Sequence, residues 1–343
     1  MRVAARTSSG AGSPSSGGSS SGGSSSDARS DARSDALAGR AASPATGGRR
    51  PASAVPLAPS PGLLAGALLP RRRPADLPDR VVEARGVVAD PAHLDAWVRV
   101  CAGRTGAPVP GSLPGAFTHV LASGASMRLL LDPRSPLPPL GLVHVAQRLE
   151  VLRPVDVREP LDLAVGARDL RPHRRGRQLD VVATATAAGE VVWRGTSTYL
   201  HREPVPGGAA PSSAGAPRSP AGERPAPPAG AVRWVVPAGT GRAYAAVSGD
   251  PNPIHLSRPT ARLLGFRRPV AHGMWTLAHA LLDLEGRLPT AHDVTARFLR
   301  PLALPGRAVH GWRAQEDGDG VLSLAVRRER DGEPHLLADV APL

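Results

Sequence analysis

The sequence has no lysine, a single cysteine and few aromatic residues, and each shortage excludes something. Because Cys101 is the one cysteine, an intrachain disulfide and a cysteine-rich metal centre are both excluded. No apolar run approaches the roughly 18 to 20 residues that span a bilayer. The apolar run at 63–69 precedes the arginines at 71–73, which is the reverse of a secretory signal. We therefore expect a cytoplasmic protein without a membrane span.

The cationic side chains are all arginines, and the net charge is +13. Aromatic residues make up 3% of the chain, too few for a platform on which nucleic-acid bases stack. The arginines are also scattered along the chain, apart from a local run at 171–177. We therefore expect no nucleic-acid partner. An anionic carrier suits some of these arginines better, because one guanidinium contacts two phosphate oxygens at once.

Two segments of biased composition divide the chain. Residues 1–55 consist largely of Ser, Gly, Ala and Arg, and they bury too little apolar surface to offset the entropy of ordering. We predict that they form a disordered tail. Residues 203–230 are rich in Pro, Ala and Gly, which is typical of a linker. Folded regions are therefore predicted at 60–202 and 231–343.

The two folded regions show the same order of predicted elements. In the second region, helices are predicted at 240–247, 260–264 and 271–284, and strands at 294–298, 308–312, 321–326 and 336–340. In the first region, helices are predicted at 94–101 and 117–131, and strands at 142–152, 161–165, 179–185 and 191–200. Each region thus predicts an α+β unit in which a curved antiparallel sheet wraps around one apolar helix.

Short matching segments indicate an internal duplication. Thr105–Pro110 resembles Ser248–Pro253, and Leu152–Val155 resembles Leu299–Leu302, at similar spacing. The polar residues of the second copy have small or apolar counterparts in the first, with Asp250 opposite Ala107, Asn252 opposite Val109 and His255 opposite Ser112. Only the second copy is therefore predicted to carry chemistry.

The segment from Ser248 to His255 is the strongest candidate for a site. Its two prolines fix φ and remove backbone donors, so the loop is stiff. A carboxylate at Asp250 and an imidazole at His255 can then converge on one small volume, where histidine serves as acid or base. Asp-Pro and Asn-Pro are also ordinary turn formers. That interpretation explains the loop but leaves His255 without a role.

Gly273 stands at the start of the long buried helix. The first turn of a helix presents unpaired N–H groups and the positive end of the dipole, which can polarise a carbonyl. A ligand can approach Gly273 closely because it has no side chain. Close helix packing is the alternative explanation of this glycine. We expect the neighbouring His272 to be a satisfied structural histidine.

Three segments in this order resemble the (R)-specific enoyl-CoA hydratase motif of the MaoC-like dehydratases: Ser248–His255, Gly265-Phe266 and Ala271–Met274. The region from 60 to 340 resembles actinobacterial 3-hydroxyacyl-thioester dehydratases with two hot-dog repeats. Pro138–Val145 and His173–Gly176 support this in the first region. The resemblance implies a double hot-dog fold, with a degenerate repeat at 60–202 that leaves room for longer acyl chains, and a catalytic repeat at 231–343.

The resemblance also implies an activity and roles for residues. It implies a hydro-lyase of fatty-acid or related acyl metabolism, which reversibly hydrates a trans-2-enoyl thioester of CoA or acyl carrier protein to the (R)-3-hydroxyacyl form. Asp250 and His255 would hold the catalytic water and move protons, and the Gly273 N–H would bind the thioester carbonyl. The residues that would shape the loop are Ser248, Asn252 and Tyr244. No metal or other cofactor is implied.

Several points stay open at the level of sequence. Arg267 and Arg268, in the loop before Gly273, are candidates for contacts to the carrier's phosphates, or else two solvated arginines. A hot-dog thioesterase and a non-catalytic subunit that binds acyl thioesters are the alternative functions. Because one chain already contains two repeats, a monomer and a homodimer are both possible. The sequence also leaves open which member of the pair is base and which is acid, and how long the acyl chain is.

Overall fold

The computed structural model describes five segments of the chain: residues 72–102, 111–203, 232–284, 286–315 and 319–343. Three predictions lie outside these residues, namely the tail at 1–55, nearly all of the linker at 203–230, and the motif at 105–110. Within the part described, no helix is both long and apolar enough to cross a membrane.

The described part of the first half contains five strands and three helices. In chain order they are β1 (Val81–Val87), α3 (Pro91–Ala102), α4 (Gly115–Leu121), α5 (Ser123–Leu130), β2 (Leu142–Val151), β3 (Leu161–His173), β4 (Gly176–Ala187) and β5 (Glu190–Arg202). The single helix predicted at 117–131 is therefore two helices. They meet at Ala122, where ψ is −8°, and the adjoining Ser123 hydroxyl donates to the carbonyl of Ser248 in the second half at 2.7 Å.

The second half repeats this order with extra turns before its central helix. Its elements are β6 (Val232–Val236), α6 (Thr240–Ser248), η1 (Pro253–His255), α7 (Arg258–Leu263), α8 (Gly273–Leu282), β7 (His292–Phe298), β8 (Gly306–Ala314), β9 (Leu322–Arg328) and β10 (Pro334–Pro342). The strands β1 and β6 were not predicted. Both lie at the edges of the sheet and have only two buried residues each, so neither shows a clear apolar pattern.

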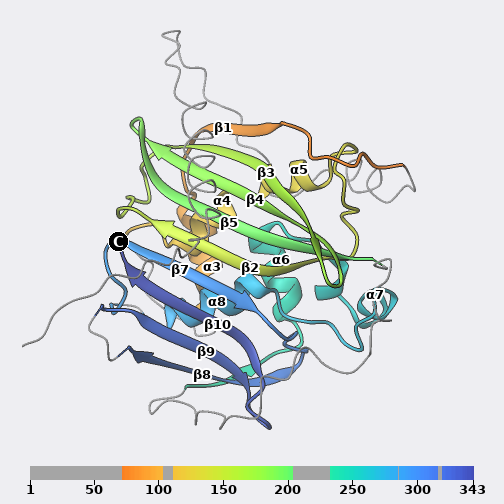
Figure 1. Ribbon diagram of the computed structural model, residues 1–343. Helices are drawn as coiled ribbons and strands as arrows, with labels where there is room; N and C mark the ends of the chain where they lie inside the picture. Colours follow the sequence, from red (N-terminus) through yellow and green to blue (C-terminus); the bar gives the residue numbers. More distant parts are fainter. Residues whose placement is uncertain (1–71, 103–110, 204–231, 285, 316–318) are drawn as a thin grey trace, which may run out of the picture.

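All ten strands form one antiparallel sheet in the order β1-β3-β4-β5-β2-β7-β10-β9-β8-β6. The second half of this order is the first half reversed, as a twofold relation between two copies requires. The copies join where β2 pairs with β7, from Ala146 opposite Arg297 to Val151 opposite His292. The sheet curves around the helices, and α8 lies against it (Figure 1). Every residue of α8 from Met274 to Leu281 is buried, as expected of a central helix. The predicted α+β double hot-dog fold is confirmed.

Matching hydrogen bonds show which residues of the two halves are equivalent. The amide of Leu113 donates to the carbonyl of Val155 at 2.8 Å, and that of Ala271 donates to the carbonyl of Leu302 at 2.8 Å. These contacts fix the approach to α4 and α8, respectively. They also agree with the sequence match between 152–155 and 299–302.

The same comparison corrects one detail of the sequence alignment. Ser112 forms a bridge with Asp156 next to Leu113, whereas the bridge next to Ala271 is made by Val270. Ser112 therefore stands in the place of Val270, and not in that of His255. The shorter connection of the first half has no room for α7, so an alignment that counts onward from the shared prolines goes out of register.

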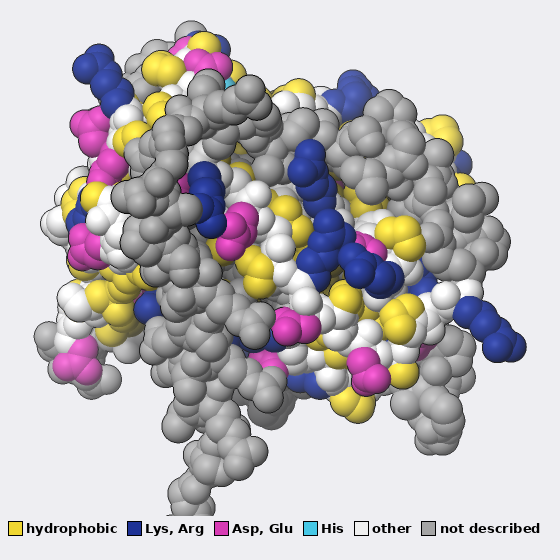
Figure 2. Space-filling model, turned by 90° about the horizontal axis from the view of Figure 1, so that it is seen from above, with side chains coloured by type: hydrophobic (Ala, Val, Ile, Leu, Met, Phe, Trp, Pro, Cys, Tyr) yellow, Lys and Arg dark blue, Asp and Glu magenta, His cyan; other side chains and the backbone are white. Residues whose placement is uncertain are grey.

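Arginine side chains on the face seen in Figure 2 lie among acidic and apolar ones and do not form a continuous basic surface. Many of the described arginines are paired. Arg153 bonds to Glu159 at 2.8 Å, and Arg177 bonds to Glu203 at 2.5 Å. These two pairs are partly buried, so they are screened less by solvent than fully exposed pairs are.

Candidate active site

The loop between α6 and η1 is held by its own polar side chains. Helix α6 ends at Gly249 with φ of 71°, a left-handed conformation that glycine adopts without strain. Beyond it, the amide of Asp250 donates to the Ser248 hydroxyl at 3.3 Å, and the amide of Asn252 donates to Oδ1 of Asp250 at 3.0 Å. The amide of Ile254 in turn donates to Oδ1 of Asn252 at 3.4 Å. Each short polar side chain thus forms a turn that positions the next residue.

The first half supports this loop from outside. Nδ2 of Asn252 donates to the carbonyl of Leu142 in β2 at 3.4 Å, in addition to the bond between Ser123 and the Ser248 carbonyl. Both contacts reach the loop from elements that carry none of the predicted catalytic residues. The first half is therefore part of the scaffold of the site.

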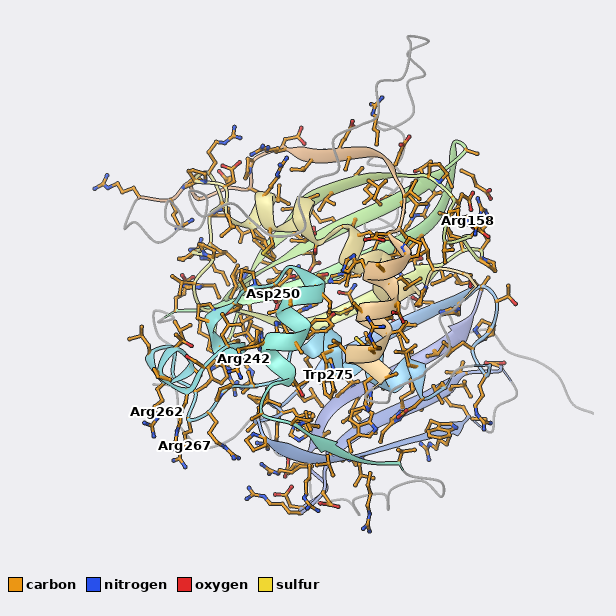
Figure 3. All side chains as sticks on the ribbon, turned by 180° about the vertical axis from the view of Figure 1, so that it is seen from behind. Arg158, Arg242, Asp250, Arg262, Arg267 and Trp275 are labelled. Atoms are coloured by element: carbon orange, nitrogen blue, oxygen red, sulfur yellow. The ribbon has the colours of Figure 1, made fainter. Side chains whose placement is uncertain are left out.

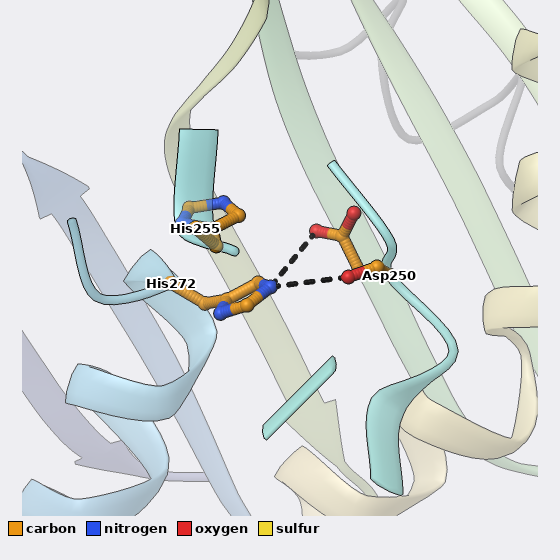
Figure 4. Close-up of side chains that lie close together, drawn as sticks. All are labelled: Asp250, His255 and His272. Carbon is orange, nitrogen blue, oxygen red and sulfur yellow. Dashed lines mark hydrogen bonds and ion pairs between the residues drawn. The ribbon is translucent and has the colours of Figure 1, made fainter. Parts of the chain in front are cut away.

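Asp250, His255 and His272 lie close together near the N-terminus of α8 (Figure 4). The two histidines are 7% and 3% exposed, while the Asp250 side chain keeps 36% of its surface. Nδ1 of His255 lies 2.7 Å from the carbonyl of Val270. Because a carbonyl only accepts, this nitrogen carries the proton, and Nε2 of neutral His255 presents a lone pair.

His272 links the two predicted catalytic residues. Its ring stacks on that of His255 with centroids 3.5 Å apart and planes at 23°. Its Nε2 lies 3.2 Å from the backbone carbonyl of Asp250 and 3.7 Å from Oδ2 of the same residue. His272 is not a satisfied structural histidine as expected, because its buried Nδ1 has no hydrogen-bond partner among the described residues.

Burial is the main electrostatic influence on both rings. It lowers the pKa of His255, against the opposing effects of the Asp250 carboxylate and the Val270 carbonyl. It also lowers the pKa of His272 well below the ordinary value, and the adjoining His255 adds to that effect. Both imidazoles are therefore neutral at neutral pH, and His255 is the one that Asp250 favours for accepting a proton.

These three residues are also a possible donor set for a metal ion, since their donor atoms lie within 4.8 Å of one another. However, the two rings are nearly parallel, so their lone pairs do not converge on one point. Coordination by both would require one ring to turn out of the stack. The arrangement fits proton transfer better than metal binding.

Gly273 is the first residue of α8, so its amide has no acceptor within the helix. A Cβ at this position would lie 2.9 Å from Cδ1 of Phe298, closer than real contacts allow. The equivalent residue, Gly115, begins α4, and its Cβ would lie 2.7 Å from Cγ2 of Val151. Close packing thus explains a glycine in both halves, and only Gly273 also borders the cavity beside Asp250 and His255.

That cavity has a volume of about 410 Å³ and runs between the two halves. It is lined by six of the predicted site residues: Tyr244, Ser248, Asp250, Asn252, His255 and Gly273. Tyr244 is 2% exposed, and its ring lies 4.9 Å from that of His272. The first half supplies much of the opposite wall, including the apolar side chains of Val120, Met127, Leu142 and Leu200.

Arg267 and Arg268 do not line this cavity. They border a shallow surface depression with Arg258 and Arg262, and Phe266 is the one described residue shared with the cavity wall. Arg262 and Arg267 point outward at the rim of the molecule, away from Asp250 (Figure 3). The arginines that do line the cavity include three from the first half, Arg174, Arg175 and Arg202, and none of them was a candidate from the sequence.

Three more cavity residues were missed in the first half: His119, His144 and Tyr199. His144 lies within the segment that carried the resemblance, at 138–145, but its pattern is that of a strand and gives no sign of a site. Nothing in the sequence around His119 or Tyr199 marks them, because they reach the cavity only through the pairing of the two halves.

Comparison with known proteins shows what this chain is similar to. The family model described as MaoC like domain matches residues 231–312. The 3-hydroxyacyl-thioester dehydratase X of Mycobacterium tuberculosis is 36% identical over 280 residues, which cover 81% of this chain and 95% of that protein. A crystal structure of HtdX from the same organism matches 77% of this chain and 100% of its own, at 32% identity and a TM-score of 0.64. A MaoC-like dehydratase from Phytophthora capsici, at 15% identity, covers 78% of this chain and 96% of its own with a TM-score of 0.59, and so supports the fold alone.

Proposed function

The chain belongs to the MaoC-like dehydratase family, and we propose that it catalyses the reversible loss of water from an (R)-3-hydroxyacyl thioester. The observation that carries this proposal is that Asp250, His255 and Gly273, the first residue of α8, all line one cavity between the two halves. The related mycobacterial protein bears the name of the same activity.

The proton transfers follow from the state of His255. Nε2 of the neutral ring takes the C2 proton of the substrate, because Nδ1 is already bonded to the Val270 carbonyl. The Asp250 carboxylate stabilises the resulting imidazolium. The same proton then passes to the 3-hydroxyl as the C3–O bond breaks, and water leaves. One group can perform both steps when the proton and the hydroxyl depart from the same face, which is a syn elimination.

Gly273 serves the other end of the reaction. When C2 loses its proton, negative charge moves to the thioester oxygen. The amide N–H at the start of α8, together with the positive end of the helix dipole, would stabilise that charge. The cavity beside Gly273 allows the carbonyl to approach. Ser248, Asn252 and Tyr244 act by holding the loop and the rings, through the bonds and contacts described above.

The carrier and the division of the chain complete the proposal. We assign the residues 60–202 and 231–343 to a non-catalytic and a catalytic repeat joined by 203–230. A single chain supplies both walls of the cavity, so a monomer is sufficient for a complete site. The phosphates of the carrier, which is CoA or acyl carrier protein, would bind to exposed arginines. Arg267 and Arg268 are candidates, together with the arginines that line the cavity itself.

Loss of enoyl-thioester absorbance with crotonyl-CoA and with a long-chain trans-2-enoyl-CoA tests the proposal. The wild-type protein should hydrate at least one of them, and Asp250→Asn and His255→Ala should each reduce kcat by about 100-fold or more. A thiol reagent in parallel detects released CoA. Release of thiol without hydration would favour a thioesterase, and binding without turnover would favour a non-catalytic subunit.

A further inference from the structure

Three ring side chains of the first half form a cluster on the cavity wall, and the proposed mechanism does not use them. His119 comes from α4, His144 from β2 and Tyr199 from β5. The ring of His144 stacks on that of Tyr199 at 4.8 Å and lies 6.3 Å from that of His119. We call these three residues the polar cluster.

The polar cluster has hydrogen-bonding capacity that the protein does not satisfy. Nε2 of His144 is buried and has no hydrogen-bond partner among the described residues. Leaving a buried polar group unpaired costs free energy, which a ligand that satisfies the group recovers. A cavity wall built only for an alkyl chain would avoid that cost with apolar residues, as Val120 and Leu142 do beside the cluster.

The position of the polar cluster places it along the acyl chain. The ring of His144 lies 4.9 Å from that of Phe298, and Phe298 is the ring that closes over Gly273. Phe298 thus contacts both the polar cluster and the residue whose amide is proposed to bind the thioester carbonyl. An acyl chain that leaves Gly273 past Phe298 therefore comes within reach of the cluster, which lines the same cavity.

The charge state of the polar cluster indicates which chemical group it would bind. Burial lowers the pKa of His119 to about 4 and that of His144 to about 3, and it raises the pKa of the Tyr199 phenol. All three are uncharged at neutral pH, so each neutral imidazole offers one donor and one acceptor. A hydroxyl group matches this pairing. A carboxylate does not, since it offers no donor and finds no cation in the cluster.

We propose that His119, His144 and Tyr199 form a subsite for a second hydroxyl group, carried on the acyl chain beyond the carbons that react. The preferred substrates are then 3-hydroxyacyl or 2-enoyl thioesters whose chain bears a further hydroxyl. This proposal rests on the proposed function, because it assumes that the thioester carbonyl is bound at Gly273.

The test compares trans-2-enoyl-CoA substrates of equal length, either unsubstituted or hydroxylated at successive carbons beyond C4. We expect kcat/KM to be about tenfold higher for a hydroxyl at one position, which is the ratio that one well-formed hydrogen bond gives. His119→Leu and His144→Leu should each bring this ratio close to one. Two variants are used so that the conclusion does not depend on the folding of either one alone. The control His173→Leu changes another histidine of the cavity wall outside the cluster, and it should keep the ratio.

Equal kcat/KM for all hydroxylated and plain chains in the wild type would overturn the subsite. So would a ratio that survives both leucine variants. Because the unsubstituted chains report the dehydratase reaction itself, their turnover separates the two proposals. If they are hydrated without discrimination, the subsite is wrong and the function stands. If no enoyl-CoA is hydrated at all, the proposed function has failed and the subsite fails with it.

Discussion

Gly273→Ala should damage catalysis far more than it damages the fold. The added Cβ would lie 2.9 Å from the Phe298 ring, so the ring or the start of α8 must move by a few tenths of an ångström. Overpacking of this kind costs about 1 to 3 kcal/mol of stability. The amide that is proposed to bind the thioester oxygen moves with the helix. Displacement of such a group costs about 100-fold in kcat.

The first half of the molecule provides a matched control. Gly115 occupies the equivalent place at the start of α4, and its Cβ would lie 2.7 Å from Val151. Gly115→Ala should therefore lower the free energy of unfolding by a similar amount, about 1 to 3 kcal/mol. It should leave kcat within about twofold, because no reacting atom lies at that helix end.

Steady-state hydration of an enoyl-CoA and denaturant unfolding, applied to both variants, measure the two effects separately. The expected result is a similar loss of stability in the two variants and a loss of kcat in Gly273→Ala alone. If kcat falls equally in both variants, the effect is one of packing. If Gly273→Ala keeps its kcat while losing stability, the Gly273 amide does not bind the carbonyl, and the assignment is refuted.

Three further results are expected. Because the pKa of His255 is lowered, kcat/KM should be constant from pH 8 to about 6.5 and should fall only at lower pH. Asp250→Asn removes a charge that raises the pKa of His255, so the residual activity of this variant should fall at a still lower pH. Asn252→Ala removes bonds to Ile254 and Leu142, so denaturant unfolding should show a loss of about 1 kcal/mol, and steady-state kinetics a loss of about tenfold in kcat. Replacing Arg267 and Arg268 together by Ala should raise KM for acyl-CoA without changing kcat, and unchanged KM would leave the phosphates to the cavity arginines.

The pH profile has a counterpart in stability. His255 and His272 have folded pKa values below the unfolded value of about 6.5, so the unfolded state binds more protons between those values. Their contribution to stability is complete above about pH 6.5 and is lost as the pH falls towards the folded pKa values. Replacement of His272 by Gln should reduce this loss of stability at acidic pH, as measured by denaturant unfolding.

Local sequence patterns predicted most of the helices and strands, and they marked the loop at 248–255 as the candidate site. The apolar stretch at 271–284 gave α8, and the alternation at 294–298 gave β7, because both elements depend on which faces are buried. The loop at 248–255 could be recognised because its prolines and polar residues act on their immediate neighbours. These are short-range effects, and a single sequence carries them.

The parts that were missed depend on pairing across the molecule. The stacking of His272 on His255 requires the chain to return after α7, and the polar cluster reaches the cavity only because β2 joins β7. Arg267 became a candidate for the carrier's phosphates because it is close to Gly273 in the chain, and its side chain points outward, away from Asp250. Closeness in the sequence did not predict which residues line the cavity where the loop turns away from it.

The two halves share a structural frame and differ in the polar loop. Leu113 and Ala271 make the same backbone bond, and Gly115 and Gly273 are both forced by packing, so the frame around each helix start is retained. The second half differs by the longer connection that holds η1, α7 and the polar loop. The first half supports that loop through Leu142 and Ser123, and it lines the cavity with its own polar cluster. Under the proposed function, the first half therefore remains necessary although it lacks Asp250 and His255, because it forms one wall of the cavity in which the substrate would bind.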